Sequence, residues 1–108
     1  RLLTMGTKKK MRGIQDLEKK YGSITLGMFL KTFREADNLT QVEFAAKLGL
    51  SRANLCDLEK DRKSASPARA AKIARIIGVP ETVLIQLAIQ DVIRASHLHY
   101  SVELKKVS

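Results

Sequence analysis

Residues 40–59 read TQVEFAAKLGLSRANLCDLE and contain two short amphipathic patterns that meet at a sharp corner. Thr40 followed by Glu43 predicts a capping box, in which each side chain bonds a backbone N–H group at the start of a helix. Gly49 can adopt the positive φ that ends this first helix. Ser51 is a typical N-cap for a second helix that begins at once. So tight a corner indicates that the angle between the two helices matters.

The apolar residues of both helices predict one shared buried side, because they recur at helical spacing. These residues are Phe44, Ala45 and Leu48 in the first helix and Leu55 and Leu58 in the second. The opposite side of the second helix carries short and polar residues, namely Arg52, Ala53, Asn54, Asp57 and Lys60. Two short helices joined by a three-residue turn form a helix-turn-helix unit, whose second helix protrudes.

Three further helices are predicted around this unit, over residues 25–37, 64–78 and 80–95. Ser66 and Pro67 are a typical N-cap and first helical residue, and Gly78 is a typical terminator. The last of these helices is apolar on more than one side and must be covered on more than one side. Residues 14–22, which read IQDLEKKYG, indicate a short additional helix upstream.

Residues 97–105, HLHYSVELK, change the apolar period from helical to two. This alternation predicts a strand with one buried face. No other segment reads as a strand, and a lone strand leaves its N–H and C=O groups unpaired. We expect two chains to meet about a two-fold axis, with these strands paired and packed on the apolar helix. A disordered tail, or a strand that joins a partner protein's sheet, are the alternatives.

Residues 26–63 resemble the Cro/repressor-like (XRE-type) helix-turn-helix family. The matching features are Leu26-Gly27, Leu30, Arg34, Leu39-Thr40-Gln41, Ala45, Leu48-Gly49, Ser51-Arg52 and Glu59. The resemblance implies an all-α, lambda-repressor-like bundle of five helices, to which the predicted C-terminal strand is added. We therefore expect a basic tail over residues 1–24, a DNA-binding domain over 25–96 and a dimerisation strand over 97–108.

The family pattern also implies roles for individual residues, with the second helix of the unit in the major groove of DNA. Phosphate contacts are implied for Gln41 and Ser51. Base-edge contacts are implied for Arg52, Ala53 and Asp57, with Asn54 beside them. Backbone contacts are implied for Lys60, Arg62 and Lys63. Arg34 and Glu59 are implied to form a partly buried pair that orients the protruding helix, with limited net stabilisation.

Two positions depart from the family pattern. Asp61 stands where the family often has Gly, and Asp can adopt positive φ at some cost. Asp57 places a carboxylate at a base-reading position, where it repels phosphate but can accept from cytosine N4. Either Asp57 reads a cytosine or it is an exposed charge paired with Lys60 or Arg52. The second alternative is preferred.

The chain has a formal net charge of +9, which favours polyanionic partners. The first twelve residues carry five basic and no acidic side chains, so about half of the excess lies in the tail. With Cys56 as the single cysteine, no intramolecular disulfide is possible, which fits a cytoplasmic protein. No apolar run approaches the ~20 residues of a membrane span, and no secretory signal is visible.

These features predict a sequence-specific transcriptional regulator, a repressor that binds double-stranded DNA as a homodimer on a palindromic operator. A finer prediction is an antitoxin that represses its own operon and binds a toxin protein. The alternative is a protein-interaction module that uses the same fold without binding DNA. No enzyme activity or cofactor is expected, because the sequence shows no paired carboxylates, phosphate-binding Gly-rich loop or nucleophile–base set. His97 and His99 share one face of the predicted strand, but two exposed ligands are too few for a tight metal site, and none is expected.

Overall fold

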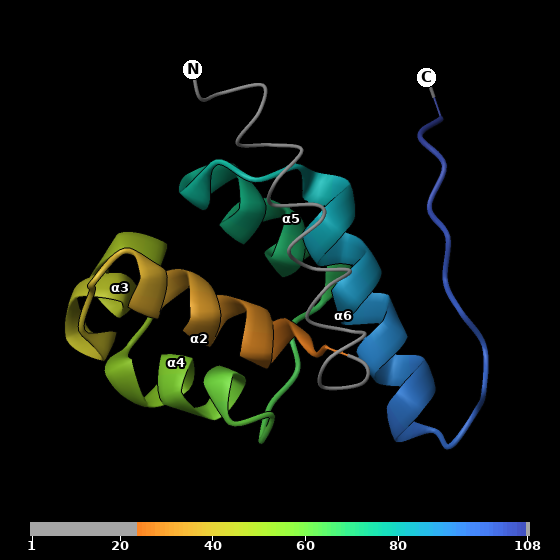
Figure 1. Cartoon of the computed structure of the whole chain (residues 1–108), viewed down its shortest axis with the longest axis horizontal. Helices are drawn as coiled ribbons and strands as arrows, with labels where there is room; N and C mark the ends of the chain where they lie inside the picture. The colour runs from red at the N-terminus through yellow and green to blue at the C-terminus, as the bar shows by residue number, and fades with distance from the viewer. Residues whose placement is uncertain (1–23, 108) are drawn as a thin grey trace.

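The computed structural model describes residues 24–107 of the chain, and these residues form a bundle of five helices (Figure 1). The helices are α2 (Leu26–Ala36), α3 (Gln41–Leu48), α4 (Arg52–Glu59), α5 (Pro67–Ile77) and α6 (Glu81–Ala95). The five helices of the predicted bundle are therefore confirmed. The basic tail and the short helix expected over residues 14–22 lie outside the described residues. No helix within residues 24–107 is both long and apolar enough to cross a membrane.

Four of the helices begin at a hydroxyl side chain that accepts a backbone N–H three residues later. These N-caps are Thr25, Thr40, Ser51 and Ser66. At the start of α3 the capping box is complete, because Glu43 also accepts from the backbone N–H of Thr40 at 2.8 Å. Each cap satisfies a donor that the helix itself cannot pair, so the predicted starts are confirmed.

Each of the five helices is followed, one or two residues after its last residue, by a residue with left-handed backbone. These residues are Asn38, Gly49, Asp61, Gly78 and His97, with φ between 56° and 80°. The next residue then donates its N–H to the carbonyl five residues back, as Leu50 does to Ala45 at 2.8 Å and Arg62 to Asp57 at 2.8 Å. This is the hydrogen bond of a Schellman motif. The expected positive φ at Gly49 and Asp61 is confirmed.

The core is one cluster to which all five helices contribute, and its fully buried side chains include Leu30, Phe44, Leu55 and Leu84. Gly27 allows the closest approach in this core. A Cβ atom at Gly27 would collide with the backbone carbonyl oxygen of Leu58. The missing side chain therefore lets the start of α2 lie directly against the end of α4.

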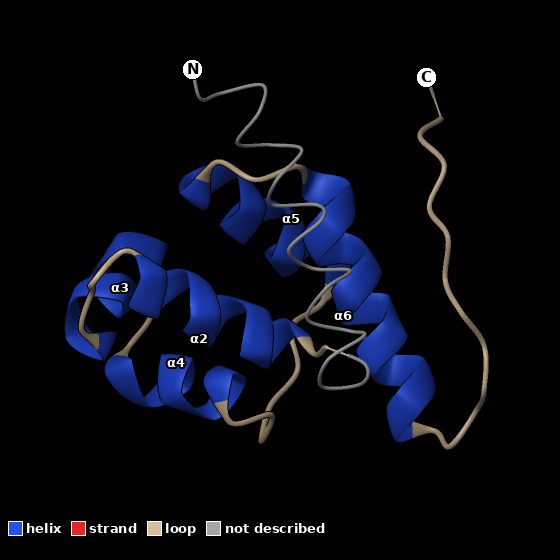
Figure 2. Ribbon diagram, in the orientation of Figure 1, coloured by secondary structure: helices blue, strands red, loops and turns tan. Residues whose placement is uncertain are grey.

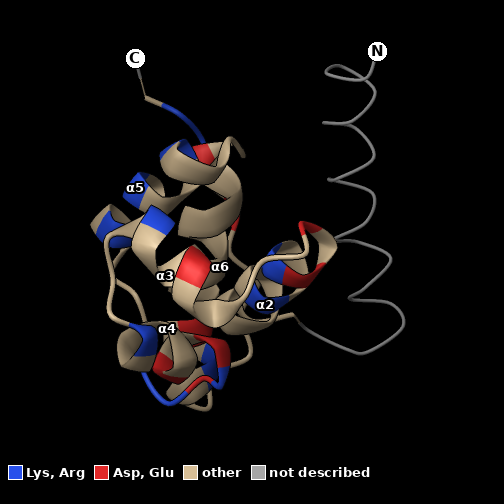
Figure 3. Cartoon of the chain, turned by 90° about the vertical axis from the view of Figure 1, so that its left-hand side faces the viewer, with Lys and Arg blue, Asp and Glu red and all other residues tan. Residues whose placement is uncertain are grey.

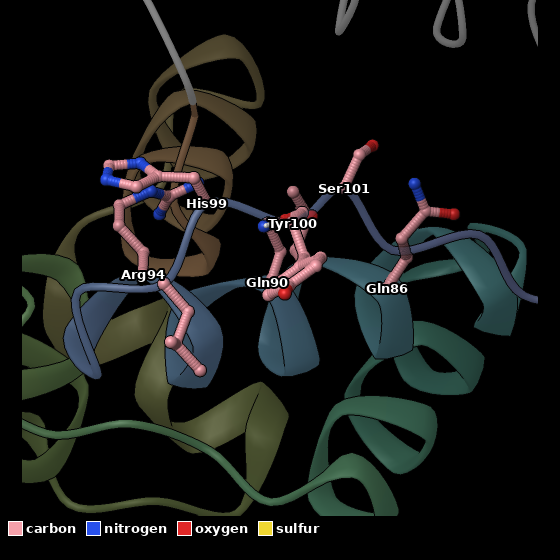
Figure 4. A pocket seen from close by; sticks show the side chains of 8 residues that line it. Gln86, Gln90, Arg94, His99, Tyr100 and Ser101 are labelled. Atoms are coloured by element: carbon pink, nitrogen blue, oxygen red, sulfur yellow. Dashed lines mark hydrogen bonds between the residues drawn. The ribbon is translucent and has the colours of Figure 1, made fainter.

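The prediction of a C-terminal strand is wrong, because residues 24–107 contain no strand (Figure 2). After α6 the chain turns back at His97 and runs extended along the same helix (Figure 1). The Gln90 amide donates to the Tyr100 carbonyl at 2.6 Å and accepts from the Val102 N–H at 2.8 Å; Figure 4 shows Gln90 and Tyr100 side by side. The alternating pattern thus produces extended backbone, but the segment meets a side-chain amide instead of a neighbouring strand.

Candidate nucleic-acid interface

Helix α4 packs on α2 and α3 through one side and leaves its N-terminal end open to solvent. Leu55 and Leu58 are buried, whereas the first residues of the helix are exposed. The exposed residues are Ser51, Arg52, Ala53 and Asn54. Since the Ser51 hydroxyl caps the N–H of Asn54 at 3.1 Å, the first turn is well formed. These four predicted contact residues form one continuous solvent-facing surface.

The corner between α3 and α4 is built as the sequence predicts. Ala45 is buried where the two helices meet, and Gly49 ends α3 with φ 71°. Leu50 then packs against the core, which anchors the turn from inside. Both sides of the corner are thus held by buried contacts, and α4 lies at the edge of the bundle against α2 and α3 (Figure 1).

A buried ion pair joins α2 to α4 at the base of this unit. Arg34 contacts Glu59 through Nε–Oε2 at 2.7 Å and Nη2–Oε1 at 3.1 Å, so the pair is bidentate. The side chains of Arg34 and Glu59 are 13% and 2% exposed. The hydrogen bond to Glu59 raises the pKa of Arg34 above its ordinary value. Arg34 also donates to the Leu39 carbonyl at 2.9 Å, and the implied pair is thus confirmed.

Gln41 belongs to the same buried network, which the sequence pattern did not predict. Its Nε2 atom donates to Glu59 Oε1 at 3.0 Å, so one carboxylate is bonded by side chains from both α2 and α3. The amide nitrogen carries two hydrogens, and this bond uses one of them. Gln41 therefore makes a structural contact and keeps one amide N–H that this contact does not use. The sequence signal for this contact was the polar residue at the first position of α3. That signal does not identify its partner Glu59, which lies 18 residues away.

Asp57 is paired, but with other residues than the sequence pattern suggested. Arg62 Nε lies 2.9 Å from Asp57 Oδ1, and Lys63 Nζ lies 3.6 Å from Oδ2. The hydrogen bond from Arg62 is the main reason why the pKa of Asp57 lies below its ordinary value. The expected pairing with Lys60 or Arg52 is thus replaced by pairing with the loop after α4.

That loop returns to α4 because of its backbone. Asp61 is left-handed with φ 59°, and the N–H groups of Arg62 and Lys63 both bond the Asp57 carbonyl, at 2.8 and 3.2 Å. The turn therefore places two basic side chains over the carboxylate of the same residue. Figure 3 shows this mixture of acidic and basic residues around α4, whereas α5 carries only basic charged residues.

Asp91 of α6 binds the first residue of α2 and so connects α6 to the helix that packs on α4. Its Oδ2 atom accepts from the Leu26 N–H at 3.1 Å and its Oδ1 from Arg94 at 2.9 Å, so α6 holds the start of α2. Burial is the main cause that raises the pKa of Asp91 above its ordinary value. The sequence contains no local signal for this contact, because 65 residues separate the two partners.

The family described as helix-turn-helix matches residues 30–84, just over half of the chain. The chain is 34% identical over 62 residues to the immunity repressor protein of Bacillus phage phi105, covering 57% of this chain and 43% of the phage protein. It is 44% identical over 50 residues to an uncharacterized HTH-type transcriptional regulator of Methanocaldococcus jannaschii, covering 46% of this chain and 76% of that regulator. No solved structure matches the chain significantly. The chain belongs to the XRE-type helix-turn-helix family.

Proposed function

We propose that this protein is a sequence-specific DNA-binding transcriptional regulator, a repressor whose α4 enters the major groove. The observation that carries this proposal is the exposed N-terminal end of α4, a helix whose C-terminal end is tied to α2 by the bidentate Arg34–Glu59 pair. A rigid polar helix end of this kind suits the docking geometry of helix-turn-helix proteins. The names of the two relatives, a repressor and a transcriptional regulator, point the same way.

In the proposed complex, contacts divide by chemistry. Phosphate contacts come from Gln41, Ser51, Lys60, Arg62 and Lys63, which carry donors or positive charge. Base edges are read by Arg52, Ala53, Asn54 and Asp57, whose side chains lie on or beside the protruding surface. The DNA-binding domain is then residues 25–96, with residues 1–24 and 97–108 as accessory segments.

The regulator acts as a homodimer on a palindromic operator in this proposal. Two recognition helices must lie roughly 34–36 Å apart to read half-sites one helical turn apart. Helix α6 and the extended segment after it provide the dimer surface, since Val92, Leu98 and Tyr100 are large apolar side chains that stay exposed. Sedimentation at increasing protein concentration tests this part, and a monomer at every concentration would refute it.

Selection of bound sites from random double-stranded DNA tests the function as a whole. The expected result is a short motif repeated with two-fold symmetry. Recovery of unrelated sequences would instead favour a protein-interaction module that uses the fold without reading DNA. The acidic residues Asp57 and Asp61 at the C-terminal end of α4 support this alternative, whereas Glu59 is buried against Arg34 and does not.

A finer form of the proposal is an antitoxin that represses its own operon. The size of the chain and the sequence on both sides of its repressor-like core support this form of the proposal. Co-expression with the product of the adjacent gene is the test. Growth arrest by that product alone, relieved by this protein, is the expected result, and a harmless neighbour would remove the antitoxin role.

A further inference from the structure

The carboxylate of Asp57 meets two basic side chains at the edge of the α4 surface. Both of its oxygens are used, Oδ1 by Arg62 at 2.9 Å and Oδ2 by Lys63 at 3.6 Å. The basic side chains are themselves 56% and 62% exposed, so they remain accessible to a large polyanion. The left-handed turn at Asp61 holds the two residues against the carboxylate through their backbone N–H groups.

We propose that Asp57 is a specificity-determining residue that competes with DNA phosphates for Arg62 and Lys63. In the free protein the carboxylate occupies both cations. On a site that offers a base-edge donor, Asp57 accepts from the base and releases Arg62 and Lys63 to the DNA backbone. This inference rests on the proposed function, because it assumes that α4 faces base edges.

The ion pairs of Asp57 with Arg62 and Lys63 are weak because the side chains are exposed. An ion pair this open contributes little to stability and is easily exchanged for another partner. Non-specific affinity depends on how many phosphates the basic side chains neutralise, with a slope of about −0.9 in log–log salt dependence for each of them. A carboxylate that occupies two cations therefore lowers binding to random sequence. On a site that contains cytosine, the N4 amino group donates a hydrogen bond to the carboxylate. The carboxylate therefore lowers the affinity for such a site less than the affinity for random sequence.

The direct test compares the wild type with Asp57→Asn, which keeps an acceptor oxygen and removes the charge. Affinity is measured by fluorescence anisotropy for a random-sequence duplex and for the best selected site, over roughly 50–200 mM salt. For the random duplex we expect affinity to rise on the order of tenfold and the salt slope to steepen by about 0.9 for each additional phosphate that is neutralised. The rise on the selected site should be smaller, so the specificity ratio falls.

Two controls separate this competition from a simple change of net charge. Asp37→Asn makes the same substitution at an exposed residue just after α2 that forms no ion pair within the described part of the chain. It should shift the random-duplex affinity much less. In a background of Arg62→Ala and Lys63→Ala, Asp57→Asn should have no more effect than Asp37→Asn. Asp57→Ala provides a second variant, and circular dichroism of each variant verifies folding.

Equal shifts for Asp57→Asn and Asp37→Asn would overturn the competition, as would a specificity ratio that does not fall. Such a result leaves the proposed function intact if the wild type still selects a motif from random DNA. A wild type that selects no motif would overturn the proposed function and this inference together.

Discussion

Removal of the Glu59 carboxylate tests whether one buried contact network fixes the position of α4. The substitution Glu59→Ala deletes the buried counter-charge of Arg34, whose side chain is only 13% exposed. It also removes the acceptor of the Gln41 amide, 3.0 Å away. Loss of one partner of a buried ion pair typically costs roughly 3–5 kcal/mol, because the remaining charge stays desolvated.

A loss of this size is a large fraction of the stability of a small domain, which is about 5–15 kcal/mol. At about 4–8 °C per kcal/mol for a domain of this size, we expect the midpoint of thermal unfolding to fall by at least ~12 °C. The assay is urea unfolding followed by circular dichroism, with the free energy of unfolding extrapolated to water.

The matched control is Glu81→Ala, which breaks the exposed Arg75–Glu81 pair of 3.1 Å. An exposed pair contributes about 0.2–1 kcal/mol, so the control should stay close to the wild type. Glu59→Gln keeps an acceptor oxygen without the charge and should fall between the two. If Glu59→Ala cost no more than Glu81→Ala, the assignment of Arg34, Gln41 and Glu59 as the support of α4 would be wrong.

Three further outcomes follow from the same contacts. Arg52→Ala should weaken binding to the selected site by about 1–3 kcal/mol, as expected for loss of a base contact, and should change binding to random DNA little. Equal losses of affinity for the selected site and for random DNA in anisotropy titrations would make Arg52 a phosphate contact. Burial raises the pKa of Asp91, so the folded state binds the proton of this carboxyl more tightly than the unfolded state does, and its contribution to stability falls as pH rises through the raised pKa. Asp91→Asn should flatten the pH dependence of the unfolding free energy in this window. Unfolding curves that keep the wild-type pH dependence would contradict this assignment. Gln90→Ala removes the acceptor of the Val102 N–H and should speed its hydrogen exchange measured by NMR, whereas unchanged exchange would mean that another group protects this N–H.

The helix ends could be predicted from the sequence because their contacts span one helical turn. Thr40 and Glu43 bond each other's backbone three residues apart, and Ser51 and Ser66 cap in the same way. Gly49 could be placed at the turn because a left-handed residue costs least where no Cβ is present. The family resemblance added the Arg34–Glu59 pair, which spacing alone does not reveal.

The tertiary structure decided which partner each polar group meets. Asp57 pairs with Arg62 and Lys63 because the turn at Asp61 brings the loop back, and no periodicity encodes that return. The alternating tail was predicted to be a strand, yet pairing requires a neighbour, and the neighbour that the bundle supplies is the Gln90 amide. The sequence by itself therefore determined the helices and their ends, where the interacting groups are adjacent in the chain. Packing alone decided the Gln41–Glu59 and Leu26–Asp91 contacts and the path of the C-terminal segment, because those contacts exist only once segments far apart in the chain are brought together.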